Sequence, residues 1–151
     1  MDPTVAELAG AVARCLAELG LERPHVAGNS LGGAVALELA RHGAVASVTA
    51  ISPAGFWSGL ERRFAHRSLL ASWAISRRIR PYAPRLLGRP PVPATIAWGT
   101  RDALLLPTQA RRARRRLPSA RHIWLHGCGH VPMSDDRDQV AAAILRGSAA
   151  Q

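Results

Sequence analysis

Apolar residues recur at steps of three and four in the first part of the chain, which is the spacing of one face of a helix. The pattern predicts a helix over residues 2–19. Thr4 and Glu7 have the spacing of a capping box at its start, and Gly20 provides a left-handed stop at its end. The apolar face of this helix consists of Val5, Leu8, Val12, Leu16 and Leu19.

After Pro24 the apolar segments become short and continuous, and each ends in a Gly- or Pro-rich stretch. Such runs are typical of buried parallel strands, and most of them are followed by a helical pattern. This alternation predicts an α/β domain with about four parallel strands and flanking helices. The expected strands cover residues 25–27, 45–51, 94–98 and 122–125, and the expected later helices reach Gly43 and cover 109–117 and 135–145.

The chain of 151 residues matches the usual size of one domain, so we expect a single α/β domain over residues 1–151. Residues 56–90 interrupt the alternation with aromatic side chains, arginines and prolines. We interpret this segment as a short cap or lid inserted over the sheet.

Ser30 lies in Gly28-Asn29-Ser30-Leu31-Gly32-Gly33, where a predicted strand meets a predicted helix. This context favours a nucleophile elbow over an ordinary Gly-rich turn. Side chains at Gly28 and Gly32 would collide with neighbouring backbone as strand and helix close up. The Leu31 amide, at the amino end of the helix, would face a developing oxyanion.

Asp102 and His130 each follow a predicted strand, at the same edge of the sheet as Ser30. An aspartate in such a loop often only stabilises a turn, and His126 is the nearest alternative to His130. The chain order Ser, Asp, His nevertheless is that of the α/β-hydrolase triad, in which histidine acts as general base and then general acid. The sequence therefore predicts Ser30, Asp102 and His130 as nucleophile, acid and base.

These motifs, together with Trp98-Gly99-Thr100-Arg101-Asp102 and Gly127-Cys128-Gly129-His130, resemble the α/β-hydrolase superfamily, in its branch of small serine esterases and carbon-carbon bond hydrolases. The resemblance implies a serine hydrolase that acts on a carboxylic ester or related small acyl substrate without an organic cofactor. Carbon-carbon bond hydrolysis uses the same triad and stays open as an alternative.

The resemblance also implies that the first helix corresponds to the one before the nucleophile strand of the family, so that the amino-terminal half of the sheet and the second oxyanion amide are missing. The nucleophile strand then becomes an edge, and self-association through this edge is expected. One face of the sheet should be covered mainly by the last helix and should be exposed and apolar. A catalytically inactive remnant or fragment is therefore a further alternative.

The formal net charge is +10, and all 20 basic residues are arginines. Codon bias in a GC-rich genome produces such a composition without any selection for binding. A dense group on the predicted helix 109–117 nevertheless makes an Arg-rich nucleic-acid-binding module the less favoured alternative. This group consists of Arg111, Arg112, Arg114, Arg115 and Arg116.

The two cysteines, Cys15 and Cys128, have neither a disulfide framework nor the spacing of a zinc site, so no metal is expected. The first residues do not predict a secretory leader, and no apolar run reaches the ~20 residues of a membrane helix. The expected location is cytoplasmic, with no membrane partner.

Overall fold

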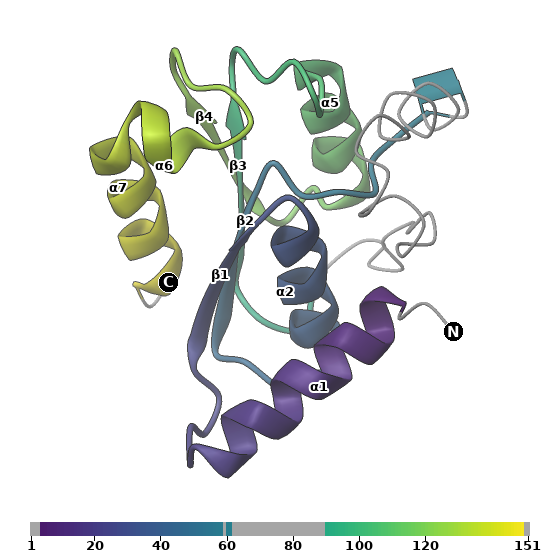
Figure 1. The fold of residues 1–151 in the computed structure, drawn as a ribbon, viewed down its shortest axis with the longest axis vertical. Helices are drawn as coiled ribbons and strands as arrows, with labels where there is room; N and C mark the ends of the chain where they lie inside the picture. Colours follow the sequence, from purple (N-terminus) through teal and green to yellow (C-terminus); the bar gives the residue numbers. More distant parts are fainter. Residues whose placement is uncertain (1–3, 59, 62–89, 150–151) are drawn as a thin grey trace.

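The computed structural model describes residues 4–58, 60–61 and 90–149. They form three layers, with α1, α2 and α5 on one side of a parallel sheet and α6 and α7 on the other (Figure 1). The elements in chain order are α1 (Val5–Glu18), β1 (His25–Asn29), α2 (Leu31–Arg41), β2 (Ser47–Ile51), β3 (Ala94–Gly99), α5 (Pro107–Arg116), β4 (Arg121–Leu125), α6 (Pro132–Asp135) and α7 (Arg137–Ser148).

The described sheet has four parallel strands in the order β1-β2-β3-β4. The α/β fold class predicted from the sequence is therefore confirmed. All four strands end at the same edge, because Asn29 pairs in register with Ile51, Ile51 with Ala97, and β3 with β4 from Thr95 to Gly99. Strand β1 lies at one edge of this sheet, as expected, and self-association through it stays a prediction.

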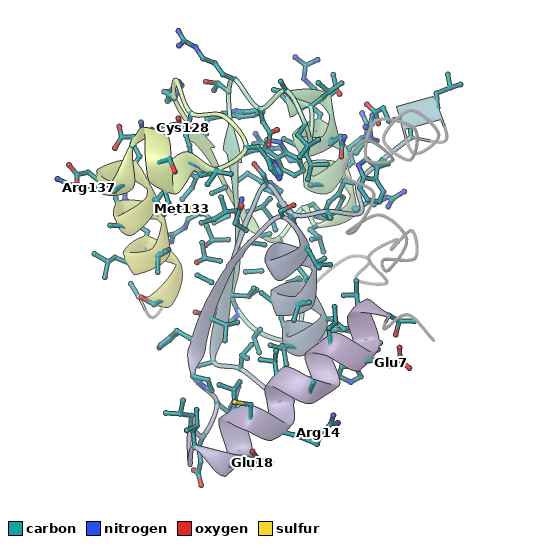
Figure 2. All side chains as sticks on the ribbon, in the orientation of Figure 1. Glu7, Arg14, Glu18, Cys128, Met133 and Arg137 are labelled. Carbon is teal, nitrogen blue, oxygen red and sulfur yellow. The ribbon has the colours of Figure 1, made fainter. Side chains whose placement is uncertain are left out.

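Helix α1 begins with the capping box that the sequence predicts. The Glu7 amide donates to Thr4 Oγ1 at 3.2 Å, and the Thr4 amide donates to Glu7 Oε2 at 2.6 Å. Glu7 lies at the amino end of the helix and Glu18 at its other end (Figure 2). Only part of the predicted apolar face is buried, since Val5 is 3% exposed and Leu19 is 67% exposed.

The last helix covers the second face of the sheet, as expected, but over β2 and β3 this face is buried rather than exposed, whereas Ala27 of β1 on the same face is exposed. Helix α7 packs on β2, β3 and β4, with Val140 and Ala143 against Ile51, Ala97 and Leu125. Farther along α7, Gly147 approaches so closely that an added Cβ would collide with Thr49 Oγ1. Over β2 and β3 this face is therefore buried, and partly polar, because a glycine lets the helix backbone lie on buried threonines.

The predicted cap over residues 56–90 lies largely outside the described residues. At its start Phe56 is fully buried and packs edge-on against Trp98, with ring centroids 6.3 Å apart. Arg112 of α5 donates through Nε to the Phe56 carbonyl at 2.6 Å and pairs with Glu61. This ion pair lowers the pKa of Glu61 to about 2.

In the part of the chain that is described, no helix has the length and apolarity to cross a membrane.

Candidate active site

Ser30 occupies a strained turn between β1 and α2, with φ 56° and ψ −115°. A residue other than glycine held at such angles costs about 1–3 kcal/mol. Three backbone hydrogen bonds fix the turn: the Ser30 amide donates to the Ile51 carbonyl at 2.9 Å, and the Ser30 carbonyl accepts from Ala34 at 3.1 Å and from Ala54 at 3.0 Å. The predicted elbow geometry is thus present at Ser30.

Two of the three elbow glycines permit a close backbone approach. A Cβ at Gly28 would collide with the Gly32 carbonyl and would lie 2.8 Å from the Gly33 nitrogen. A Cβ at Gly33 would lie 3.0 Å from both the Gly28 oxygen and Pro53 Cβ. The expected collision at Gly32 is wrong, because a Cβ there would point into open space with nothing within 4 Å.

Leu31 is the first residue of α2, so its amide has no acceptor within the helix. The aligned peptide dipoles of α2 make this amino end favourable for a negative charge. The role of the Leu31 amide as an oxyanion donor stays a prediction.

Asp102 lies in the loop that follows β3 and is 2% exposed. Its Oδ1 accepts hydrogen bonds from the amides of Leu104 at 2.9 Å and Leu105 at 2.8 Å, and its Oδ2 lies 2.9 Å from His130 Nδ1. Burial by itself would raise the pKa of this carboxyl, but the hydrogen bonds from His130 and Leu105 outweigh it and hold the pKa below its ordinary value. Asp102 is therefore a carboxylate at neutral pH.

The contact with Asp102 determines the tautomer of His130. An ionised carboxylate only accepts, so Nδ1 of His130 carries the proton and donates to Oδ2. Nε2 of the neutral ring is then the acceptor. With 16% of its side chain exposed, His130 can present this nitrogen to a reacting group.

The loop that carries His130 is held against the end of β3. Gly127 donates to Thr100 Oγ1 at 2.9 Å, and Arg101 donates to the Cys128 carbonyl at 2.8 Å. A Cβ at Gly99 would lie 2.5 Å from the Cys128 oxygen, so only glycine permits this approach. The place of Gly99 directly after the predicted strand 94–98 is visible in the sequence, but its close contact with the Cys128 backbone is not.

Asn29 connects β1 with the loop that carries His130. Its Nδ2 lies 3.2 Å from the Ile51 carbonyl oxygen and 3.0 Å from the His130 carbonyl oxygen. The sequence placed Asn29 in the elbow but gave no reason to expect contacts of its side chain. Ser30, Asp102 and His130 thus all follow strand ends at one edge of the sheet, and hydrogen bonds join their loops.

The other histidines and the buried cysteine are placed for different roles. His25 and His122 begin their strands at the opposite edge of the sheet, and His126 is exposed with its backbone bonded to Gln139. Cys128 lies beside α6 and α7 (Figure 2), and burial together with Asp136 and Asp135 raises the pKa of its thiol. This thiol is therefore a poor nucleophile.

Among the described residues, no group of three or more histidine, cysteine, aspartate or glutamate side chains is arranged to hold a metal ion.

Comparison with solved structures identifies the fold. An α/β hydrolase from the metagenome of lagoon sediments of Mar Chica, Morocco, superposes with a TM-score of 0.75 at 24% identity, over 97% of this chain and 70% of that one. An esterase from Thermogutta terrifontis gives a TM-score of 0.72 at 19% identity, over 97% and 72%. The chain has the α/β-hydrolase fold.

Similarity in sequence is confined to shorter segments. The epoxide hydrolase EphH of Mycobacterium tuberculosis is 58% identical over 53 residues, which are 35% of this chain and 25% of that protein. An acetyltransferase component of the acetoin cleaving system of Cupriavidus necator is 49% identical over 55 residues, 35% of this chain and 15% of that protein. The matched segments therefore span a quarter or less of these curated relatives. No family model matches the chain.

The lowered pKa of Asp102 predicts that stability depends on pH. Because the folded pKa lies below the unfolded value near 4, the carboxylate stabilises the fold fully above about pH 4 and loses this effect as the pH falls through the folded pKa. Asp102→Asn should lower the free energy of unfolding by about 1.5–3 kcal/mol at pH 7, and by less in acid. Urea unfolding at neutral and acid pH measures both values.

Glu22→Gln is the control for this experiment, since Glu22 is exposed and should have little effect at either pH. A loss of stability in Asp102→Asn that is equally large at neutral and acid pH would show that the charge of Asp102 does not stabilise the fold.

Proposed function

We propose that this protein is a serine hydrolase that cleaves carboxylic esters or related small acyl substrates, with Ser30 as nucleophile, His130 as base and Asp102 as acid. The observation that carries the proposal is the 2.9 Å contact of His130 Nδ1 with buried Asp102, together with the hydrogen bond from Asn29, the residue before the strained Ser30, to the His130 carbonyl. A buried carboxylate, an oriented imidazole and a strained serine are the parts of an acyl-transfer site.

The reaction would proceed in two halves. His130 Nε2 takes the proton of the Ser30 hydroxyl while Oγ attacks the acyl carbon, and the Leu31 amide donates to the oxyanion that forms. The imidazolium, stabilised by Asp102, then protonates the leaving alkoxide as the ester bond breaks. Water attacks the acyl-serine in the second half, with His130 again as base, and releases the acid and free Ser30.

The comparisons support a hydrolase of the α/β type. The structural neighbours with this fold include an esterase and an enzyme described as an α/β hydrolase, and a segment of the chain resembles an epoxide hydrolase. The serine at position 30 favours acyl transfer, because a hydroxyl activated by a neighbouring histidine is the usual nucleophile for esters. This chemistry requires no cofactor.

Turnover of p-nitrophenyl acetate and p-nitrophenyl butyrate tests the proposal. The wild-type protein should hydrolyse at least one of these esters, and Ser30→Ala should lower kcat/KM by about 10³-fold or more. His42→Gln is the matched control, because His42 is an exposed histidine at the far end of α2 and should leave the rate unchanged. Equal rates in the wild type and Ser30→Ala would refute the proposed nucleophile.

A further inference from the structure

Among the described residues, the side chain of Asn29 connects the nucleophile strand with the histidine loop. It is the last residue of β1, directly before Ser30, and its Nδ2 lies within hydrogen-bond distance of the carbonyl oxygens of both Ile51 and His130. A side-chain amide nitrogen carries two protons, so it can donate one to each acceptor. Residues 101 apart in the chain are thereby held together.

The Ile51 carbonyl also accepts the hydrogen bond from the Ser30 amide, at 2.9 Å. One carbonyl group therefore connects the backbones of the nucleophile and the base. The Ser30 amide donates to it directly, and the His130 carbonyl is linked to it through the Asn29 side chain. A shift of the histidine loop relative to β1 would break the contact at His130, while a shift of β2 would move both.

The other contacts of the histidine loop fix it to different elements. The Gly127 amide and the Cys128 carbonyl form hydrogen bonds with the loop after β3, and the Gly129 amide donates to Asp135 Oδ2 of α6 at 2.7 Å. These contacts place the loop beside Asp102 and α6. They do not involve β1 or the turn of Ser30, so Asn29 has a separate role among the described hydrogen bonds.

We propose that Asn29 is a positioning residue that sets the imidazole of His130 relative to the hydroxyl of Ser30 by holding the His130 carbonyl. This inference rests on the proposed function for its effect on rate, but its structural part stands on the hydrogen bonds alone. Since a displacement of about 1 Å can cost 10²-fold in rate, loss of the tie should lower kcat by about 10- to 100-fold. KM should change little, because Asn29 acts through His130.

Asn29→Asp is the most informative variant. It has nearly the same shape as asparagine, but its carboxylate has no proton to donate and would repel both carbonyl oxygens. Asn29→Gln retains the two amide protons on a longer side chain and should restore part of the rate. Circular dichroism and urea unfolding establish that each variant is folded, and Asn29→Ala serves instead if the aspartate variant is not.

Two measurements separate this inference from the proposed function. Crystal structures of the wild type and Asn29→Asp report the separation of His130 Nε2 and Ser30 Oγ. This separation should be larger in Asn29→Asp, while the contact of His130 Nδ1 with Asp102 should persist because other hydrogen bonds hold the loop beside Asp102. Ester turnover then gives kcat and KM for the same variants.

A larger separation of the two side chains together with a lower kcat and an unchanged KM would support the inference. An unchanged separation in the folded Asn29→Asp variant would overturn it, whatever the rate, and so would a larger separation with an unchanged kcat. If the wild type has no Ser30-dependent turnover, the proposed function fails, while the measured separation still decides whether Asn29 positions His130.

Discussion

Gly28→Ala is expected to destabilise the protein by about 3 kcal/mol or more, because the added methyl group has no room and backbone must move. The Cβ would collide with the Gly32 carbonyl and would lie 2.8 Å from the Gly33 nitrogen, so the first turn of α2 would separate from β1. The same movement would disturb Ser30. Urea unfolding followed by circular dichroism measures the loss, which is large beside the ~5–15 kcal/mol stability of an ordinary domain.

Gly32→Ala is the matched control, two residues beyond the nucleophile. A Cβ there would meet nothing within 4 Å, and the position is the second residue of α2. Alanine in a helix is favoured over glycine by about 0.5–1 kcal/mol, so this variant should be as stable as the wild type or slightly more stable. Equal effects of the two substitutions would contradict the packing described for the elbow.

Asp102→Asn is expected to lower ester turnover by about 10⁴-fold, the loss that the same change causes in a serine protease with this triad. An asparagine can donate its amide proton to Nδ1 and so favour the tautomer in which Nε2 is protonated. That ring cannot accept the proton of Ser30. The expected cause is thus the wrong tautomer of His130, with the buried loop around position 102 kept in place by the Leu104 and Leu105 amides.

The measurement is kcat/KM for p-nitrophenyl butyrate at neutral pH, in protein shown to be folded under the assay conditions. Glu22→Gln, which removes an exposed carboxylate, should retain the wild-type rate. A rate in Asp102→Asn within tenfold of the wild type would mean that the contact with His130 does not serve catalysis.

The fold could be predicted to a large extent from local patterns. The four strands lie within one or two residues of the apolar runs, and Thr4 and Glu7 form the expected cap. Periodicity carries this information because a strand or helix buries residues at fixed intervals. It indicated that the last helix covers the second face, but not that Gly147 lets this helix bury it, since that contact depends on how a helix crosses threonines far away in the sequence.

The sequence predicts the placement of candidate site residues only where they follow strand ends. Ser30, Asp102 and His130 share one edge because parallel strands end together, which the order of the elements already implies. The contact of Asn29 with the His130 carbonyl and the close approach at Gly99 arise between backbones that meet only in the folded chain. The error at Gly32 has the same origin, because the sequence does not give the direction of its missing side chain.

His130, oriented by Asp102, is expected to activate Ser30. Covalent labelling with a fluorophosphonate probe, followed by mass spectrometric mapping of the modified peptide, measures this activation. The wild-type protein should be labelled on Ser30, whereas folded Ser30→Ala and folded His130→Ala should not be labelled. Labelling of His130→Ala at the wild-type rate, or no labelling of folded wild-type protein, would show that His130 does not activate Ser30.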